Sequence, residues 1–298
     1  MRPDRRQVLR GALGVGVAAA VGALSGCTLS GSDDSTPEAS PTTDDRMTAP
    51  GRPTTEPDGP LYIAHRGGGR NWPEMTAYAY QQASLIHGLQ DLEVSVHLSA
   101  DGVLVCNHDA DTTELGSRSV VIAETPWADL QDITVSPRLT LDPDQPPRPL
   151  ARFDEILSTW VGTHTLWVEP KVDAAVEPLF RALAAAGRPE HVVWKQPINF
   201  SNFARAQQAG YRTWGYVLSG DKQQEFARTY AADPMINMLG VWTYTPEEEV
   251  SRTVAWAAEQ GKKTVMWAIR NAEDQAKAVR LGCEGLMTSD IRGLYGSA

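Results

Sequence analysis

The stretch KTVMWAIRNAEDQAKAVRLGCEGLMT, residues 263–288, contains the pattern that decides the fold. An apolar run at 263–268 is followed by an amphipathic segment at 272–281, and a second apolar run covers 285–288. Gly282 directly follows the amphipathic segment, and glycine best tolerates the left-handed conformation in which helices end. The stretch therefore predicts a strand, a helix and a second strand parallel to the first.

The same alternation continues through most of the chain. Runs with the character of strands lie at 61–65, 92–96, 165–169, 191–195, 213–217, 239–242, 263–268 and 285–288. Helical patterns lie between them at 76–86, 174–186, 203–209, 246–260 and 272–281. Eight strands with interleaved helices predict an α/β fold, a (β/α)8 TIM barrel, for which about 240 residues is a usual length. An open doubly wound sheet is the alternative, but no glycine-rich dinucleotide loop follows the first run.

One segment departs from this rhythm, because residues 103–106 follow the second strand after only a few residues. Parallel strands need a crossover of a dozen or more residues, so this pair must form an antiparallel β-hairpin extension. Asp101-Gly102 is a strong two-residue turn signal. With that turn, Ser95 is expected to face His108, and Glu93 lies one step away on the same face. The hairpin is thus expected to bring a carboxylate and a histidine together.

The first 60 residues have the composition of a targeting segment and a tether. An uncharged apolar run at 11–25 follows four arginines and is shorter than the roughly 20 residues that span a bilayer. It ends in Leu24-Ser25-Gly26-Cys27, which resembles the lipobox of bacterial lipoproteins, and Arg5-Arg6 resembles a twin-arginine export signal. We therefore expect residues 1–26 to be a signal peptide, and residues 27–60 to be a lipidated Cys27 followed by a disordered linker. An uncleaved helical anchor is the alternative.

This organisation predicts an exported lipoprotein, with the domain at 61–298 held at the outer face of the cytoplasmic membrane. The formal charge is −10, and because residues 1–26 carry four arginines and one aspartate, the remainder carries −13. Such an acidic chain without basic blocks argues against nucleic-acid binding, which needs phosphate-neutralising Lys and Arg. Cys106 and Cys283 could pair in an exported protein. Two distant cysteines are equally well buried small apolar residues, and we expect them to be unpaired.

Side chains suited to phosphoryl chemistry gather at the ends of three predicted strands and the hairpin. They are His65, Arg66, Glu93, His108, Glu169 and Lys171. Polar residues at the carboxyl ends of TIM-barrel strands face the active-site mouth. Two histidines suit general acid and base catalysis, glutamates suit a hard divalent cation, and Arg and Lys suit phosphate oxygens.

Five short motifs resemble, in order and spacing, those of the glycerophosphodiester phosphodiesterase family, which read roughly His-Arg-Gly, Pro-Glu-Asn-Thr, Glu-x-Asp, His-Asp and Glu-x-Lys. Here they are His65-Arg66-Gly67, Pro73-Glu74-Met75-Thr76, Glu93-Val94-Ser95, His108-Asp109 and Glu169-Pro170-Lys171. The resemblance covers essentially all of 61–298, including 152–157, 265–267 and 285–290. It implies a metal-assisted hydrolase that cleaves glycerophosphodiesters to glycerol 3-phosphate and an alcohol. A neighbouring substrate hydroxyl would attack phosphorus, and water would open the resulting cyclic phosphate.

The resemblance also implies roles for individual residues. His65 and His108 match the catalytic pair, one deprotonating the attacking hydroxyl and the other protonating the leaving alkoxide. Arg66, Lys171 and Trp267 match residues that bind the substrate. Glu93 and Glu169 match two of three carboxylates that hold Ca²⁺ or Mg²⁺. Glu74 is expected to be a helix first-turn acid or a support for these groups.

Two positions depart from the family pattern, because Ser95 replaces the third carboxylate and Met75 replaces an asparagine. A neutral hydroxyl is a poor ligand for a hard cation, so metal affinity should fall. Ser95 acting through water, Asp91 or His97 could compensate. Two main hypotheses follow: an active phosphodiesterase acting on glycerophosphodiesters or a glycerol-phosphate polymer, and an impaired barrel that binds a phosphate-containing ligand. A purely structural envelope lipoprotein is a third.

Overall fold

The computed structural model describes residues 59–198, 201–217 and 223–297. Its central element is a closed barrel of parallel strands: β1 (Leu61–Ala64), β2 (Asp91–Leu98), β7 (Thr165–Pro170), β8 (Val192–Pro197), β9 (Arg212–Tyr216), β10 (Met238–Trp242), β11 (Lys263–Ile269) and β12 (Gly285–Thr288). Pairing of β1 with both β12 and β2 closes the barrel. The predicted (β/α)8 fold is therefore confirmed. The predicted signal peptide and almost all of the predicted linker lie outside the described residues.

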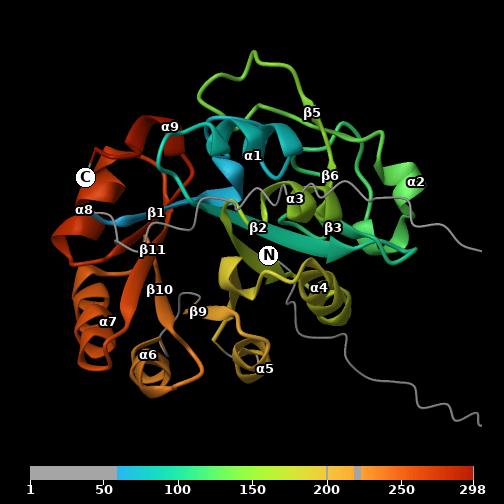
Figure 1. Ribbon diagram of the computed structural model, residues 1–298. Coiled ribbons are helices and arrows are strands. Elements are labelled where there is room, and N and C mark those ends of the chain that lie inside the picture. The colour runs from blue at the N-terminus through green and yellow to red at the C-terminus, as the bar shows by residue number, and fades with distance from the viewer. Residues whose placement is uncertain (1–58, 199–200, 218–222, 298) are drawn as a thin grey trace, which may run out of the picture. The chain divides into compact units, whose positions relative to one another are not determined.

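Helices follow the strands and lie outside them, as α4 to α8 show in Figure 1. They are α1 (Ala77–Ser84), α3 (Phe153–Trp160), α4 (Asp173–Ala186), α5 (Phe203–Gln208), α6 (Gln223–Ala232), α7 (Glu247–Glu259), α8 (Ala272–Arg280) and α9 (Ile291–Leu294), with short 3-10 turns η1 (His65–Gly67), η2 (Ile122–Glu124) and η3 (Pro189–His191). In α4, buried apolar residues recur three to four positions apart, and Gly187 ends the helix at a φ of 64°. No helix in the described part of the chain is long and apolar enough to cross a membrane.

The predicted hairpin is present, with β2 antiparallel to β3 (Leu104–Cys106), but its register differs from the prediction by one residue. The turn has three residues, 100–102, because the N–H of Ser99 donates to the carbonyl of Val103 at 2.9 Å. The hydroxyl of Ser99 also accepts from the N–H of Val103 at 2.8 Å. Gly102, at a φ of 83°, supplies the left-handed residue that a three-residue loop needs.

This shift corrects the expected pairing of Ser95 with His108. Val96 pairs with Cys106, and the N–H of Asn107 donates to the carbonyl of Ser95 at 3.2 Å. A one-residue slip exchanges the two faces of a strand, so His108 would point away from Ser95 if the strand continued. The strand ends at Cys106 instead, and His108 approaches the barrel from the loop that follows.

An insertion at 107–150 separates the hairpin from α3. It contains α2 (Trp127–Leu130), β4 (Thr134–Val135) and β5 (Arg148–Pro149), and β6 (Ala151–Arg152) then pairs with β3. Apolar side chains give it a small core of its own: Val105, Ile122, Leu130, Ile133, Val135 and Leu150. Figure 1 shows α2 and β5 on the side of the molecule where β3 and β6 lie.

Alternation along the strands separates two cores. Side chains such as Leu92 and Val168 point outward and pack beneath the helices. Inward-pointing side chains fill the barrel: Ile63, Trp167, Val193, Trp214, Tyr216, Met238, Val265, Trp267 and Met287. Glu169 and Lys195 lie two residues beyond Trp167 and Val193, so they continue the inward series at the carboxyl ends of their strands. Cys106 and Cys283 are separate, buried thiols.

Candidate active site

A buried lysine joins the two predicted carboxylates. The Nζ of Lys195 lies 2.7 Å from Oε1 of Glu93 and also donates to Oε2 of Glu169. The hydroxyl of Ser95 lies 3.2 Å from each of the same two oxygens. Strand register produces this cluster, because Ser95 pairs with Glu169, and Val168 pairs with Trp194 immediately before Lys195.

All three charged groups of this cluster remain ionised at neutral pH. Burial acts to raise the pKa of Glu169, but Lys195 and Lys171 outweigh it and lower that pKa to about 2. Burial is likewise outweighed at Glu93, chiefly by Lys195, so its pKa lies well below the usual range. Burial alone would lower the pKa of Lys195, but Glu169 and Glu93 raise it above its ordinary value.

The other oxygen of Glu169 has two further donors. The phenol of Tyr216 donates to Oε1 at 2.5 Å, and the Nζ of Lys171 lies 3.2 Å from the same atom. Our sequence analysis did not identify Lys195 or Tyr216 as site residues. The available signal was a lysine at the carboxyl end of an otherwise apolar barrel strand, on the same alternating face as Val193.

His108 reaches this cluster from the loop after β3. Its Nδ1 lies 2.8 Å from Oδ1 of Asp109, and its Nε2 lies 3.4 Å from the Nζ of Lys171. Burial, followed by the charges of Arg66 and Lys171, lowers the pKa of His108 to about 4. The ring is therefore neutral at pH 7, with a proton on Nδ1 for Asp109 and a lone pair on Nε2.

His65 and Arg66 approach from the end of β1. Arg66 has a left-handed backbone, with a φ of 54° and a ψ of 34°, which costs an L-residue about 1 kcal/mol. In this conformation its N–H donates to Oε2 of Glu93 at 2.7 Å, while its Nη1 donates to Glu74 at 2.8 Å. The Nδ1 of His65 lies 2.8 Å from the hydroxyl of Ser289. Burial lowers the pKa of His65 well below 6.5, although Glu93 opposes it.

Trp267 belongs to the inward-pointing aromatic group. Its ring centroid lies 5.4 Å from that of Trp214 and 5.0 Å from that of Tyr216, and Tyr216 contacts Glu169. The structure therefore places Trp267 in the wall beside the cluster. Met75 is also buried there, and its left-handed φ of 59° is a conformation that asparagine adopts more readily than methionine.

The two residues considered as replacements for the third carboxylate are engaged elsewhere. Asp91 accepts a hydrogen bond from the indole of Trp167 at 2.8 Å. The Nε2 of His97 lies 3.2 Å from the carbonyl of His108. The charged group that contacts both Glu93 and Glu169 in their place is the ammonium of Lys195.

The donor set does not fit the expected Ca²⁺ or Mg²⁺. Calcium takes roughly six to eight oxygen ligands, and magnesium requires near-octahedral oxygen coordination. Here the facing oxygens of Glu93 and Glu169 converge on an ammonium, and the third position holds the neutral hydroxyl of Ser95. Within the described ranges, no group of three or more His, Cys, Asp or Glu side chains is placed to hold a metal ion.

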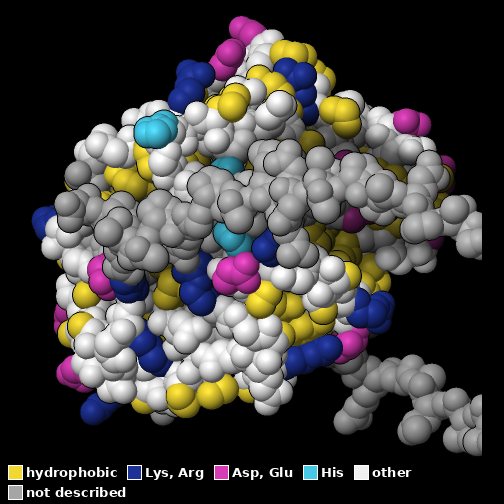
Figure 2. Space-filling model, viewed as in Figure 1, with side chains coloured by type: hydrophobic (Ala, Val, Ile, Leu, Met, Phe, Trp, Pro, Cys, Tyr) yellow, Lys and Arg dark blue, Asp and Glu magenta, His cyan; other side chains and the backbone are white. Residues whose placement is uncertain are grey.

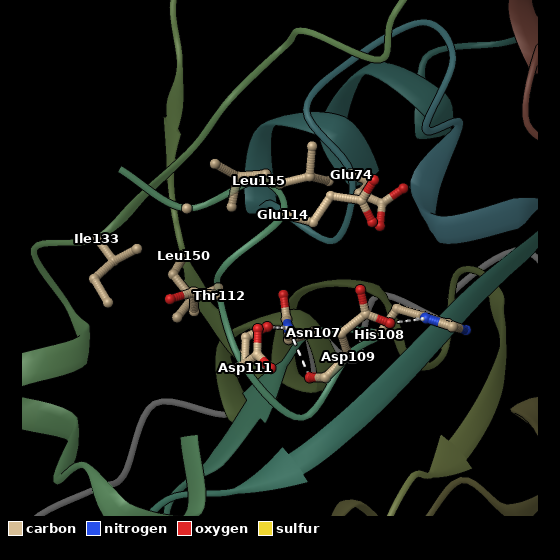
Figure 3. Close-up of a pocket in the computed structure, with 12 residues that line it drawn as sticks. Glu74, Asn107, His108, Asp109, Asp111, Thr112, Glu114, Leu115, Ile133 and Leu150 are labelled. Atoms are coloured by element: carbon tan, nitrogen blue, oxygen red, sulfur yellow. Dashed lines mark hydrogen bonds and ion pairs between the residues drawn. The ribbon is translucent and has the colours of Figure 1, made fainter. Parts of the chain in front are cut away.

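A pocket opens beside His108, lined by residues of the insertion and by Glu74 from the loop before α1. Glu74, His108 and Asp109 line it together with Glu114 and Leu115. Figure 3 shows His108 and Asp109 on one side of this pocket and the carboxylates of Glu74 and Glu114 on the other. On the face seen in Figure 2, acidic and basic side chains are interspersed rather than gathered into a single basic patch.

Comparison with known proteins finds one family, both by a family model and among individual relatives. A model of the glycerophosphoryl diester phosphodiesterase family matches residues 65–292. A glycerophosphodiester phosphodiesterase of Arabidopsis thaliana is 33% identical over 86 residues, which are 28% of this chain but only 23% of that protein.

Solved structures share the fold at low sequence identity. A glycerophosphodiester phosphodiesterase of Thermotoga maritima has a TM-score of 0.62 and 17% identity, with 80% of this chain and 98% of that chain covered. A phosphodiesterase of Oleispira antarctica, solved in complex with its product sn-glycerol-3-phosphate, has a TM-score of 0.57 and 20% identity. That match covers 79% of this chain and 95% of the Oleispira chain.

Proposed function

The chain belongs to the glycerophosphoryl diester phosphodiesterase family, and we propose that it hydrolyses glycerophosphodiesters to glycerol 3-phosphate and an alcohol. The observation that carries this proposal is the convergence of His65, His108, Arg66 and Lys171 around the buried Glu93–Glu169 pair. Two neutral imidazoles supply proton transfer, and two cationic side chains offset the charge of a phosphodiester. The product bound to the Oleispira antarctica relative supports glycerol 3-phosphate as the product here.

In the first step, a hydroxyl of the glycerol unit attacks phosphorus and its proton passes to one imidazole. The bond between phosphorus and the leaving oxygen breaks, and that oxygen takes a proton from the other imidazole in its protonated form. Water then opens the cyclic phosphate with the two roles reversed, which restores both rings. His65 uses Nδ1 for Ser289, so its Nε2 remains for the substrate. His108 uses Nδ1 for Asp109, and its Nε2 faces the Nζ of Lys171 at 3.4 Å, so a substrate would meet this imidazole next to that lysine.

The low pKa values of the two histidines suit the ring that acts as the general base. For the ring that acts as the general acid, they mean that its pKa must rise when the substrate binds. In the free protein both rings are neutral at pH 7, so either can accept a proton. The acid must be protonated before the leaving group departs. A bound phosphodiester anion favours this state, because a nearby negative charge raises the pKa of an imidazole.

The alternative hypothesis, a barrel that binds a phosphate-containing ligand without turnover, rests on Ser95. The contacts of Ser95 weaken it, because the hydroxyl lies 3.2 Å from an oxygen of Glu93 and 3.2 Å from an oxygen of Glu169, and can donate its one proton to either within a charge-paired cluster. We therefore favour the active hydrolase.

The experiment is release of glycerol 3-phosphate from glycerophosphocholine by the full chain, beside His65→Ala and with or without EDTA. Turnover that is lost in His65→Ala supports the proposed function. Absence of turnover for glycerophosphocholine, glycerophosphoethanolamine and a glycerol-phosphate polymer, with retained binding of glycerol 3-phosphate, would instead support the binding hypothesis.

We also propose that the chain is exported and lipidated at Cys27, on the strength of the basic, apolar and lipobox-like sequence at 1–27. Acylation would place the barrel at the outer face of the cytoplasmic membrane, next to phospholipid-derived substrates. The test is metabolic labelling with a clickable fatty acid. Label should enter the native chain and be lost in Cys27→Ser, and equal labelling of both chains would contradict the proposal.

A further inference from the structure

The ammonium of Lys195 lies where two carboxylates converge. It contacts Oε1 of Glu93 and Oε2 of Glu169, the same two oxygens that the Ser95 hydroxyl reaches at 3.2 Å. These four side chains come from three adjacent strands, β2, β7 and β8. In the motif pattern that the sequence resembles, this is the position at which the carboxylates hold a divalent cation.

The environment of Lys195 fixes its position. Its side chain is only 5% exposed, and a buried ammonium is tolerated only when it is paired and hydrogen-bonded. Its Nζ also lies 5.8 Å from the ring centroid of Trp214 and 5.5 Å from that of Tyr216. Carboxylates and aromatic faces therefore surround the charge on rigid strands, which preorganises it for a reacting anion.

The two departures at this site compensate each other in charge. Replacing a carboxylate by Ser95 removes one negative charge, and replacing a divalent ion by an ammonium removes one positive charge. The net charge of the site is therefore unchanged. An ammonium has three donors, and two of those of Lys195 contact Glu93 and Glu169.

We propose that Lys195 is a built-in cation that replaces the divalent ion, so that this active site works without bound metal. The proposal rests on the hydrolase activity proposed above. Lys195 keeps Glu93 and Glu169 together and adds positive charge next to Lys171, where the phosphodiester oxygens would lie. Glu93 in turn accepts the backbone N–H of Arg66, so the same cation also positions the phosphate-binding arginine.

The effect of removing Lys195 distinguishes the proposed role from a purely structural one. If Lys195 served only to neutralise buried carboxylates, its removal would reduce stability but would not create a metal requirement. If it replaces the metal, removing it and restoring the third carboxylate should convert the chain into a metal-binding protein. The informative variant is therefore Ser95→Asp/Lys195→Met.

The first measurement is metal binding by isothermal titration calorimetry, which does not depend on turnover. We expect no saturable Ca²⁺ or Mg²⁺ binding to the native full chain, and saturable binding to Ser95→Asp/Lys195→Met. The matched control is Lys262→Gln, which removes a lysine whose Nζ contacts the carbonyl of Asp233 away from the site. Saturable binding to the native chain that Glu93→Gln abolishes would overturn the proposal, and this arm needs no lysine variant to fold.

The second measurement is glycerol 3-phosphate release. We expect native turnover to be unchanged by EDTA, and Lys195→Met to lose about 10²- to 10³-fold in kcat/KM. In Ser95→Asp/Lys195→Met, added Ca²⁺ or Mg²⁺ should restore most of that loss. EDTA-sensitive native turnover, or a folded double variant that neither binds nor responds to metal, would overturn the inference. A native chain inactive on every substrate would contradict the proposed function instead, while the calorimetric result would still decide the role of Lys195.

Discussion

The Nε2 atom of His108 lies 3.4 Å from the Nζ of Lys171, a residue 63 positions further along the chain. Lys171 in turn donates to Glu169, which Lys195 joins to Glu93. The lone pair of a neutral imidazole can accept a hydrogen bond from an ammonium, and the charge of Lys171 favours the neutral state of His108. The tertiary contact thus links the predicted acid–base histidine to the buried charge cluster.

The lowered pKa of His108 makes stability depend on pH. Its pKa is about 4 in the folded chain and about 6.5 in an unfolded one. As the pH falls from 6.5 to 4, the unfolded state binds a proton that the folded state does not, so the free energy of unfolding decreases. We expect His108 to account for about 2 kcal/mol of this decrease, allowing for its partial exposure.

Urea unfolding of the native chain and His108→Gln at pH 7, 5.5 and 4.5 measures this contribution. The native chain should lose more stability than the variant over that range. Parallel pH curves for the two proteins would show that His108 titrates normally in the folded state.

Both histidines should be required for turnover. His65→Ala and His108→Ala are each expected to lower kcat/KM by about 10²- to 10⁴-fold, because each removes a proton-transfer group. His87→Ala is the matched control, since His87 is exposed and outside the site. Release of glycerol 3-phosphate measures the activity of all three variants. Near-native activity of His65→Ala or His108→Ala would show that the replaced histidine takes no part in the mechanism.

Glu74 should act through Arg66, whose guanidinium it contacts at 2.8 Å. Glu74→Ala leaves the guanidinium without this anchor, so we expect KM for the phosphodiester to rise about tenfold, with a smaller change in kcat. Glu74→Gln retains an acceptor oxygen, so its KM should lie between those of the native chain and Glu74→Ala. Steady-state kinetics separate these effects, and a change confined to kcat would argue against a positioning role for Glu74.

Tyr216 should stabilise the ionised form of Glu169. Tyr216→Phe removes a buried donor 2.5 Å from the carboxylate, so the pKa of Glu169 should rise. Unfolding free energy should fall by about 1.5–3 kcal/mol, the range for a hydrogen bond to a charged group. Tyr244→Phe, at a side chain that is 59% exposed, is the control. Thermal unfolding compares the two, and equal melting temperatures would indicate that water replaces the lost donor.

Much of this architecture follows from local patterns. Apolar runs such as Leu61–Ala64 and Gly285–Thr288 were predicted as strands and form strands of the barrel. A buried strand needs a short apolar run, and a helix needs apolar residues at its own period, so both leave marks within a few residues. His65 and Glu169 could be proposed for the same reason, because each ends such a run within a motif.

Errors and omissions arose where the decisive interaction was not local. The hairpin register depended on the side chain of Ser99, which accepts from Val103 and supports a three-residue turn where two residues were expected. Helix α6 was not predicted, and the insertion at 107–150 lacks the repeating pattern that made the barrel predictable.

The role of Lys195 is the clearest case of a feature decided by tertiary structure. Along the chain it is one lysine at the end of one strand, separated by 102 positions from Glu93 and by 26 from Glu169. Its distance to both carboxylates depends on the register between β2, β7 and β8, and register is set by pairing across the closed barrel. The amino-acid sequence alone was enough to predict the barrel and to propose His65 and His108 as an acid–base pair, because periodicity and motifs are local. Which cation faces Glu93 and Glu169 required the fold, because only strand pairing brings those charges within hydrogen-bond distance.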